Sequence, residues 1–223
     1  MHKLIRLLKR PAGTDPARFH DEWVNHATAG VNAIDGLEGY VLNLCLSGAY
    51  RKMEPVFDGY AEEYYVSAGA LAARAHGVGS PIEVERQAQA TLMPVAVEVL
   101  LDGDVPRDSI KSIELIRRRP DLTHEQFDRY WLERHGPLAC AVPFLRYEQN
   151  HLTPGAANQP DLPFHGAAIT WFHSTNDMRA AALTDAYQRI RDDERNFLLG
   201  ASPVLLTTTR VIVPHAGLAS LQH

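Results

Sequence analysis

The residues best suited to chemistry in this sequence lie between positions 127 and 151. His135 follows Phe127 and Trp131, and Tyr147 and His151 come shortly after it. An imidazole titrates near neutral pH, so His135 can move a proton at a carbon or oxygen atom without a cofactor. We therefore predict His135, Tyr147 and His151 as catalytic residues, with Trp131 as a substrate contact. The alternative is that His135 only caps the turn before the Gly-Pro pair that follows it.

Alternation along the strand that carries Tyr147 divides its polar side chains between two faces. Tyr147, Gln149 and His151 share one face, whereas Glu148 and Asn150 point the other way. A row of Tyr, Gln and His is unusual in a core, so it indicates a polar pocket. We expect Gln149, Asn150 and His151 to position a substrate there. The alternative is that Gln149 and His151 face solvent at a sheet edge.

A second set of polar residues, which comprises His26, Tyr40, Asp58 and Glu62, lies in the first half of the chain. Asp58 and Glu62 are four positions apart on an expected strand, or about 13 Å, which is too far for a direct acid/base pair. Either carboxylate could orient His26, or both could be solvated. We list these four residues, together with His165, as expected substrate contacts.

Motifs for metal and cofactor chemistry are missing from the sequence. The 11 histidines show no HxH, HxxxH or HExxH spacing, and Cys45 and Cys140 lie in different halves. There is no GxGxxG, P-loop, GxSxG or CxxC motif. We therefore expect no metal site, no disulfide and no bound cofactor.

The charge and hydrophobicity of the sequence indicate which kinds of binding partner to expect. The 223 residues include 22 Lys and Arg against 27 Asp and Glu, for a net charge of -5. No basic run interleaved with aromatic residues occurs, which disfavours nucleic acid. The apolar stretch at the N-terminus is too short for a signal peptide or a membrane span. We expect a cytoplasmic protein with a small-molecule ligand and no membrane partner.

The chain also contains an internal repeat. Matches that preserve order connect its two halves at the pairs Arg10/Arg119, Pro11/Pro120, Phe19/Phe127, Trp23/Trp131, His26/His135, Leu37/Leu145, Tyr40/Tyr147, Asn43/Asn150 and Gly59/Gly166. Where the second copy has its Tyr-Gln-His row, the first has Tyr40, Leu42 and Leu44, as a packed interior would. The contrast favours a pocket in the second copy and a scaffold role for the first.

Each copy is predicted to run strand, helix, strand, strand, helix, strand. Strands are expected at 3–9, 37–46, 57–66 and 93–101, and again at 111–118, 145–152, 164–173 and 203–213. Thr14 or Asp15 and Thr123 are expected helix N-caps. The second helices are expected at 67–77 and 175–197.

This order predicts an α+β fold in which two ferredoxin-like βαββαβ repeats form an intramolecular dimeric α+β barrel. The expected boundaries are 1–101 for the first repeat, 102–109 for a linker, 110–214 for the second repeat and 215–223 for a C-terminal tail.

The motif pattern resembles the EthD-like family of dimeric α+β barrel proteins. The resemblance rests on the second copy's Phe127, Trp131, His135-Gly136-Pro137-Leu138 and Tyr147-Glu148-Gln149-Asn150-His151. The first copy keeps Phe19, Trp23, His26 and Tyr40, and its Phe57-Asp58-Gly59 with Glu62 is similar to the family's third strand. The resemblance implies small, often cyclic ligands, because relatives include lactone isomerases, cofactor-free polyketide monooxygenases and proteins of hydrocarbon or ether catabolism.

These observations predict a cofactor-independent isomerase or lyase that acts on a small hydrophobic carbonyl, lactone or polyketide-like compound. His135 would be the general acid or base, and Tyr147 would stabilise the developing oxyanion. The alternatives are a cofactor-free or haem-dependent monooxygenase and a non-catalytic binder of hydrophobic metabolites. The fused pair could also form a homodimer.

Overall fold

The computed structural model describes residues 2–51, 53–77, 79–159 and 162–215. These residues fall into two compact units. Unit 1 comprises residues 2–96 with 205–215, and unit 2 comprises residues 97–204. Apart from His215, the expected tail 215–223 lies outside the described residues. Both units mix helices with antiparallel strands, so the predicted α+β class is confirmed.

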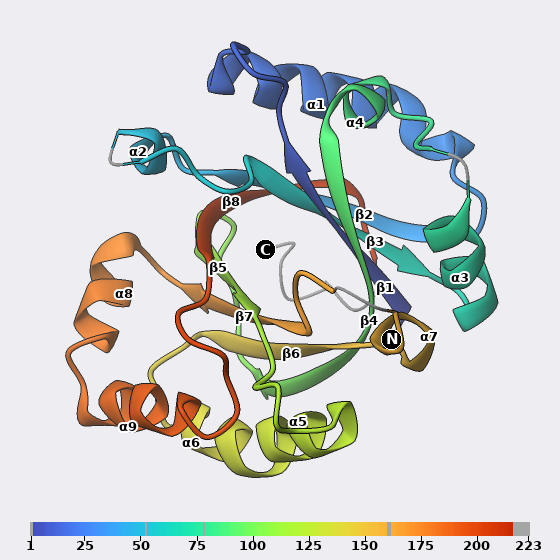
Figure 1. The fold of residues 1–223 in the computed structure, drawn as a ribbon. Helices are drawn as coiled ribbons and strands as arrows, with labels where there is room; N and C mark the ends of the chain where they lie inside the picture. The colour runs from blue at the N-terminus through green and yellow to red at the C-terminus, as the bar shows by residue number, and fades with distance from the viewer. Residues whose placement is uncertain (1, 52, 78, 160–161, 216–223) are drawn as a thin grey trace. The chain divides into compact units, whose positions relative to one another are not determined.

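Unit 1 is built on a sheet whose strands pair in the order β4-β1-β3-β2-β8. The strands are β1 His2–Lys9, β2 Leu37–Cys45, β3 Gly59–Tyr65, β4 Gln89–Asp102 and β8 Val204–Val213, of which β4 and β8 belong to unit 1 up to residue 96 and from residue 205. The helices are α1 Pro16–Gly30, η1 Val31–Ala33, α2 Ser47–Tyr50, α3 Ala68–His76 and α4 Glu83–Gln87. In Figure 1, α1 and α4 lie side by side in this unit.

Unit 2 contains an antiparallel sheet in the order β5-β7-β6. Its strands are β5 Ile110–Ile116, β6 Arg146–Leu152 and β7 Gly166–Phe172. Its helices are α5 His124–Tyr130, the π-helical turn η2 Trp131–His135, α6 Gly136–Ala139, α7 Pro154–Ala157, α8 Thr175–Ala181 and α9 Asp185–Glu194. In Figure 1, α6 and α9 lie next to each other in this unit.

The helix starts agree with the expected caps. Asp15 caps α1 by accepting the Arg18 N–H at 2.9 Å. Thr123 and Gln126 form a reciprocal capping box at the start of α5, with distances of 2.8 and 3.1 Å. Local side-chain chemistry therefore determined where both helices begin.

Two expected elements differ from the structure. The helix predicted at 175–197 is wrong as one element, because the chain leaves α8 at Ala181 and begins α9 only at Asp185, with Thr184 as a new N-cap that accepts the Tyr187 N–H at 3.2 Å. The strand predicted at 93–101 is longer, since pairing with β1 already starts at Gln89.

In each unit a tryptophan on the first helix packs against a glycine at the start of the third strand. A Cβ on Gly59 would lie 3.0 Å from Trp23 Cζ3, and one on Gly166 would lie 2.7 Å from Trp131 Cζ3. Trp23 and Trp131 are buried, at 0% and 1% exposure. The tryptophan face is therefore packed against the sheet in both units, and the glycines allow the close approach.

Among the described residues, no helix combines the length and apolar character needed to cross a membrane.

We predict that Gly166→Ala destabilises the protein by about 1–3 kcal/mol, because the new methyl group must displace the Trp131 ring. Equilibrium urea unfolding measures the effect. Gly155→Ala is the matched control, since a Cβ there has no neighbour within 4 Å. Equal stability of the two variants would contradict the packing role given to Gly166.

Candidate active site

His135 lies at the end of a widened helical turn. In η2 the Gly136 N–H donates to the Trp131 carbonyl five residues before it. A π-helical turn holds one residue more than an α-helical turn. His135 follows Trp131 by four residues, whereas His26 follows Trp23 by only three. The wider turn therefore takes up the one extra residue in the second half.

The imidazole of His135 pairs with the carboxylate of Asp193 on α9. His135 Nδ1 lies 2.9 Å from Asp193 Oδ2, and the imidazole is only 8% exposed. Asp193 Oδ1 accepts hydrogen bonds from the Tyr130 hydroxyl at 2.6 Å and from the Asn196 amide at 2.9 Å. The Phe197 ring packs on the imidazole with 4.8 Å between ring centroids. These contacts fix the orientation of the imidazole.

Burial and hydrogen bonding together set the charge of this pair. Desolvation lowers the pKa of His135 below 6.5, although the nearby Asp193 favours the charged form. Burial alone would raise the pKa of Asp193, but hydrogen bonds from Tyr130 and His135 lower it. A neutral imidazole that donates through Nδ1 is therefore expected at pH 7. Its Nε2 has no partner among the described residues and is free to accept a proton.

A second titratable group lies in the same unit. Burial and the neighbouring charge of Glu114 raise the pKa of Glu194 to about 8, while Arg191 opposes this shift. Arg191 Nη1 lies 2.7 Å from Glu194 Oε1 and 3.2 Å from Glu114 Oε1. The charges of Glu114 and Arg191 also act on the pKa of His135. Glu194, the neighbour of Asp193 in the sequence, can therefore carry a proton at neutral pH.

Tyr147, Gln149 and His151, which the sequence places on one face of a strand, are linked by buried hydrogen bonds. Gln149 Nε2 donates to the Tyr147 hydroxyl and to the Trp131 carbonyl, both at 2.9 Å. Gln149 Oε1 lies 3.1 Å from His151 Nε2, and His151 Nδ1 lies 2.8 Å from Asp128 Oδ1. The three strand residues share a face, as the alternation requires, but this face packs under α5 and η2. Gln149 is 0% exposed, so the solvent-edge alternative is wrong for it.

An open groove of about 530 Å³ lies beside His151, at the end of this series of hydrogen bonds. His151 and Asp128 line it, and His124 Nε2 is 3.2 Å from Asp128 Oδ2 without hydrogen-bond geometry. Burial alone would raise the pKa of Asp128, but contacts with the two histidines lower it. Both ring nitrogens of His151 are already bonded, which makes His151 less suited than His135 to act as a base. Tyr147 is buried below it, where burial raises the pKa of its hydroxyl.

Asn150 and His165 take no part in the hydrogen bonds that link Tyr147, Gln149 and His151. Asn150 points to the opposite face of the sheet, where its amide donates to the Ala167 carbonyl at 3.1 Å. Burial lowers the pKa of His165 to about 4, and the positive charge of Arg118 adds to the shift. Its ring centroid is 6.5 Å from that of His124. The structure therefore does not bring Asn150 or His165 together with His135.

The candidates of the first copy have structural partners. The Tyr40 hydroxyl donates to Glu85 Oε1, which also accepts the Trp23 indole N–H at 3.1 Å, and burial raises the pKa of Tyr40. His26 Nδ1 is buried without a partner. Neither carboxylate proposed to orient His26 does so through that atom.

Glu62 is fully buried in an ion pair. Lys3 Nζ lies 2.8 Å from Glu62 Oε1, and both side chains are 0% exposed. The Asn43 amide donates to the second Glu62 oxygen at 3.0 Å, and Thr209 Oγ1 donates to Asn43 Oδ1 at 3.1 Å. Glu62 therefore stabilises the sheet of unit 1 and is not the solvated carboxylate considered above.

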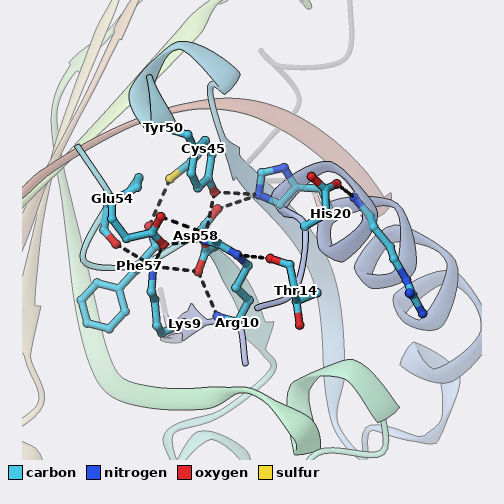
Figure 2. A network of polar contacts seen from close by, with 12 residues as sticks. Lys9, Arg10, Thr14, His20, Cys45, Tyr50, Glu54, Phe57 and Asp58 are labelled. Atoms are coloured by element: carbon cyan, nitrogen blue, oxygen red, sulfur yellow. Dashed lines mark hydrogen bonds and ion pairs between the residues drawn. The ribbon is translucent and has the colours of Figure 1, made fainter. Parts of the chain in front are cut away.

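Asp58 is the centre of a polar network that sequence reasoning did not foresee (Figure 2). Its carboxylate is 0% exposed and accepts the Arg10 backbone N–H and the Tyr50 hydroxyl, both at 2.9 Å. The Asp58 carbonyl lies 2.8 Å from His20 Nε2, and desolvation lowers the pKa of His20. Nearby, the Cys45 thiol donates to the Phe57 carbonyl at 3.4 Å (Figure 2).

Asp193, the partner of His135, is a residue of the candidate site that the sequence reasoning missed. A signal was present, because Asp193 directly precedes the Glu194-Arg195 pair that matches Glu85-Arg86, and the first copy has the apolar Val84 at this position. An acidic residue found only in the copy that carries the His-Gly-Pro-Leu motif was a candidate partner for the histidine.

A family model matches a segment in the second half of the chain. Residues 119–200 match the family model described as EthD domain. A search of curated proteins gives no significant match.

Solved structures resemble the chain over almost its whole length. An anthrone oxidase-like protein superposes with a TM-score of 0.67 at 13% identity, over 96% of this chain and 95% of that one. A candidate monooxygenase from Fusobacterium nucleatum subsp. nucleatum gives 0.57 at 9% identity, over 94% and 92%. The chlorite dismutase of Candidatus Nitrospira defluvii, in complex with imidazole, gives 0.56 at 10% identity, over 95% and 91%. Identities this low show the fold alone.

The matched segment spans the motif run from Arg119 past His135 to Asp193, and the structural relatives share the mixed α+β fold. The EthD-like resemblance stated from the sequence is confirmed for the second half of the chain, where residues 119–200 match the EthD domain model.

Proposed function

We propose that this protein is a cofactor-independent enzyme of the isomerase or lyase type, which removes a proton from carbon next to a carbonyl group in a small hydrophobic molecule. The observation that carries the proposal is the His135–Asp193 pair. A neutral imidazole oriented by a carboxylate, with Nε2 free, is the arrangement that general-base catalysis requires.

In this reaction His135 Nε2 takes the proton, and the electron pair of the broken C–H bond moves into the carbonyl to give an enolate. Asp193 stabilises the imidazolium that forms, while Tyr130 and Asn196 hold the carboxylate in place. The apolar Phe197 ring beside the imidazole suits a hydrophobic substrate. Return of the proton at another atom gives an isomer, and loss of a leaving group gives a lyase product.

Glu194 is proposed to return the proton. With a pKa raised to about 8, its carboxyl group is largely protonated at neutral pH. A base that is neutral and an acid that is protonated at the same pH form the usual complementary pair. Tyr147, Gln149 and His151 then support the site from the sheet below and do not act on the substrate directly.

Oxygenation is a second candidate, favoured by the likeness to an anthrone oxidase-like protein. The first step is the same proton removal by His135. The resulting carbanion is electron-rich and can reduce O₂ while a new C–O bond forms. Isomerase and oxygenase thus differ in the fate of one intermediate, and consumption of O₂ distinguishes them.

The residues around the groove do not fit haem, which the haem-dependent alternative needs. His151 has both ring nitrogens bonded, and both ring nitrogens of His124 are buried, so neither histidine presents a free nitrogen to a haem iron. The groove is also lined by more carboxylates than cations, namely Glu98, Glu125, Asp128 and Glu133 against Arg129, and this excess negative charge would repel the propionates of the macrocycle. No step is therefore assigned to haem.

We further propose that the chain is a fused pair of ferredoxin-like repeats, equivalent to a dimeric α+β barrel. The order β4-β1-β3-β2 in unit 1 is that of a βαββαβ repeat. Matching registers support a duplication, because Tyr40 faces Glu63 and Tyr147 faces Thr170 at a constant offset of 107 positions, the difference between 40 and 147 and between 63 and 170. A homodimer of the fused pair remains a prediction.

We predict that His135→Gln slows hydrogen–deuterium exchange at the acidic carbon of anthrone in D₂O by about 100-fold or more, because the base is removed. NMR of the substrate measures the rate. Asp193→Asn should act in the same direction, and the exposed His173→Gln is the matched control with an unchanged rate. Undiminished exchange in His135→Gln would rule out this base. Anthrone binding without any exchange by the native protein would favour the non-catalytic binder.

We predict a bell-shaped dependence of kcat/KM on pH. Activity should fall on the acidic side, at a lower pH than an ordinary histidine would give because burial lowers the pKa of His135, and again above about pH 8, where Glu194 loses its proton. Because Asp193 raises the pKa of His135, Asp193→Asn should move the acidic limb to lower pH. An acidic limb that moves to higher pH in Asp193→Asn would contradict the pairing.

A further inference from the structure

The carbonyl of Trp131 accepts two hydrogen bonds at the π-helical turn. One comes from the Gly136 N–H and closes the turn. The other comes from Gln149 Nε2 on β6, at 2.9 Å. The side chain of Gln149 thus reaches from the sheet to the backbone of the turn that ends at His135. Because π-helical turns are rare and less favourable than α-helix, such an external contact can decide which form the segment adopts.

The orientation of Gln149 is fixed at both ends of its amide. Nε2 also donates to the Tyr147 hydroxyl at 2.9 Å, and Oε1 lies 3.1 Å from His151 Nε2. His151 is held in turn by Asp128 at 2.8 Å. Since a backbone carbonyl only accepts, the amide nitrogen must face Trp131. No polar atom of Gln149 is left over for a substrate.

Gly136 provides the space for this contact. A Cβ at this position would lie 3.3 Å from Gln149 Nε2 and 3.4 Å from the Trp131 carbonyl oxygen. It would also meet Leu100 Cδ1 at 2.9 Å. The glycine of the His-Gly-Pro motif therefore leaves room where the glutamine touches the turn.

The first copy shows the alternative arrangement in the same chain. Leu42 occupies the register position of Gln149, since Leu42 pairs with Ala61 and Gln149 with Ala168. Leucine cannot donate a hydrogen bond. There α1 runs as a regular α-helix from Pro16 to Gly30. The copy without the glutamine has no π-helical turn at this place.

We propose that Gln149 is a positioning residue that holds the π-helical turn open and thereby directs His135 toward Asp193. The catalytic consequence rests on the function proposed above. The structural claim stands independently of it, because the position of His135 can be followed without any substrate. This role replaces the substrate contact expected from the sequence, which would require a buried and fully bonded amide to exchange its partners.

The test uses Gln149→Leu, which copies the first repeat, and Gln149→Glu, which keeps the size but cannot donate to Trp131. Two NMR signals of the free protein are followed: amide exchange of Gly136 and the Nδ1–H resonance of His135. We expect Gly136 exchange to become about tenfold faster or more and the His135 resonance to be lost in both variants. kcat should fall by about 10- to 100-fold with KM little changed.

Asn150→Ala is the matched control, because it removes a buried amide hydrogen bond from the adjacent position on the opposite face. It should leave the Gly136 and His135 signals as in the native protein. If Gln149→Leu does not fold, Gly136→Ala tests the same contact from the other side, with the same expected loss of the His135 resonance.

Unchanged Gly136 exchange and an intact His135 Nδ1–H signal in Gln149→Leu would overturn the proposal, even if activity fell. An intact His135 Nδ1–H signal in Gly136→Ala would do the same. Altered signals in a protein that shows no carbon-acid exchange would instead count against the proposed function and leave the positioning role in place.

Discussion

The packing of a tryptophan on a strand glycine is the constraint from which both copies are built. Trp23 over Gly59 and Trp131 over Gly166 leave no space for a Cβ, so the first helix of each unit has one fixed contact with its sheet. Helical periodicity then determines where every later side chain of that helix points. A difference of one residue after the tryptophan is therefore enough to give the following histidine a different environment.

From this shared anchor the two copies satisfy their buried polar groups in different ways. In the first copy, carboxylates complete a closed network: Arg6 Nε lies 2.7 Å from Glu63 Oε1 and 3.2 Å from Glu85 Oε2, and Glu85 also accepts from Tyr40. Such a network suits a scaffold, because breaking any member leaves a buried charge without a partner. The second unit places the tyrosine at the equivalent register position, Tyr147, under the Gln149 amide, which continues to the turn that ends at His135. Matching positions thus carry a carboxylate network in unit 1 and, in unit 2, an amide that contacts the turn of the His135–Asp193 pair.

Local signals in the sequence were sufficient for most of the elements and for the EthD resemblance of the second half. The Pro residues, the caps at Asp15 and Thr123, and the aromatic pairs on the first helices act over a few positions, so their effects could be read directly. The break between α8 and α9 was missed, because the cap at Thr184 is a single residue inside a helix-forming composition. The Glu194 shift could not be foreseen either, since it depends on burial and on Glu114, which is 80 residues away by the difference of their numbers.

For the site, the sequence supplied the residues but not the directions in which they point. The alternation of side chains along a strand correctly placed Tyr147, Gln149 and His151 on one face of the sheet. It does not indicate which of the two faces is covered by a helix. His135 was identified from its motif, whereas its partner Asp193 is a long-range contact between two helices. Tertiary packing, which no local pattern encodes, determines both.

The thiol of Cys45, beside the Asp58 network, can be used to measure local opening of the first unit. Burial raises the pKa of this thiol to about 12, so almost none of it is thiolate at neutral pH, and thiolate is the form that alkylating reagents attack. Labelling of Cys45 therefore requires the end of β2 to open, and its rate measures how often that opening happens in the native protein.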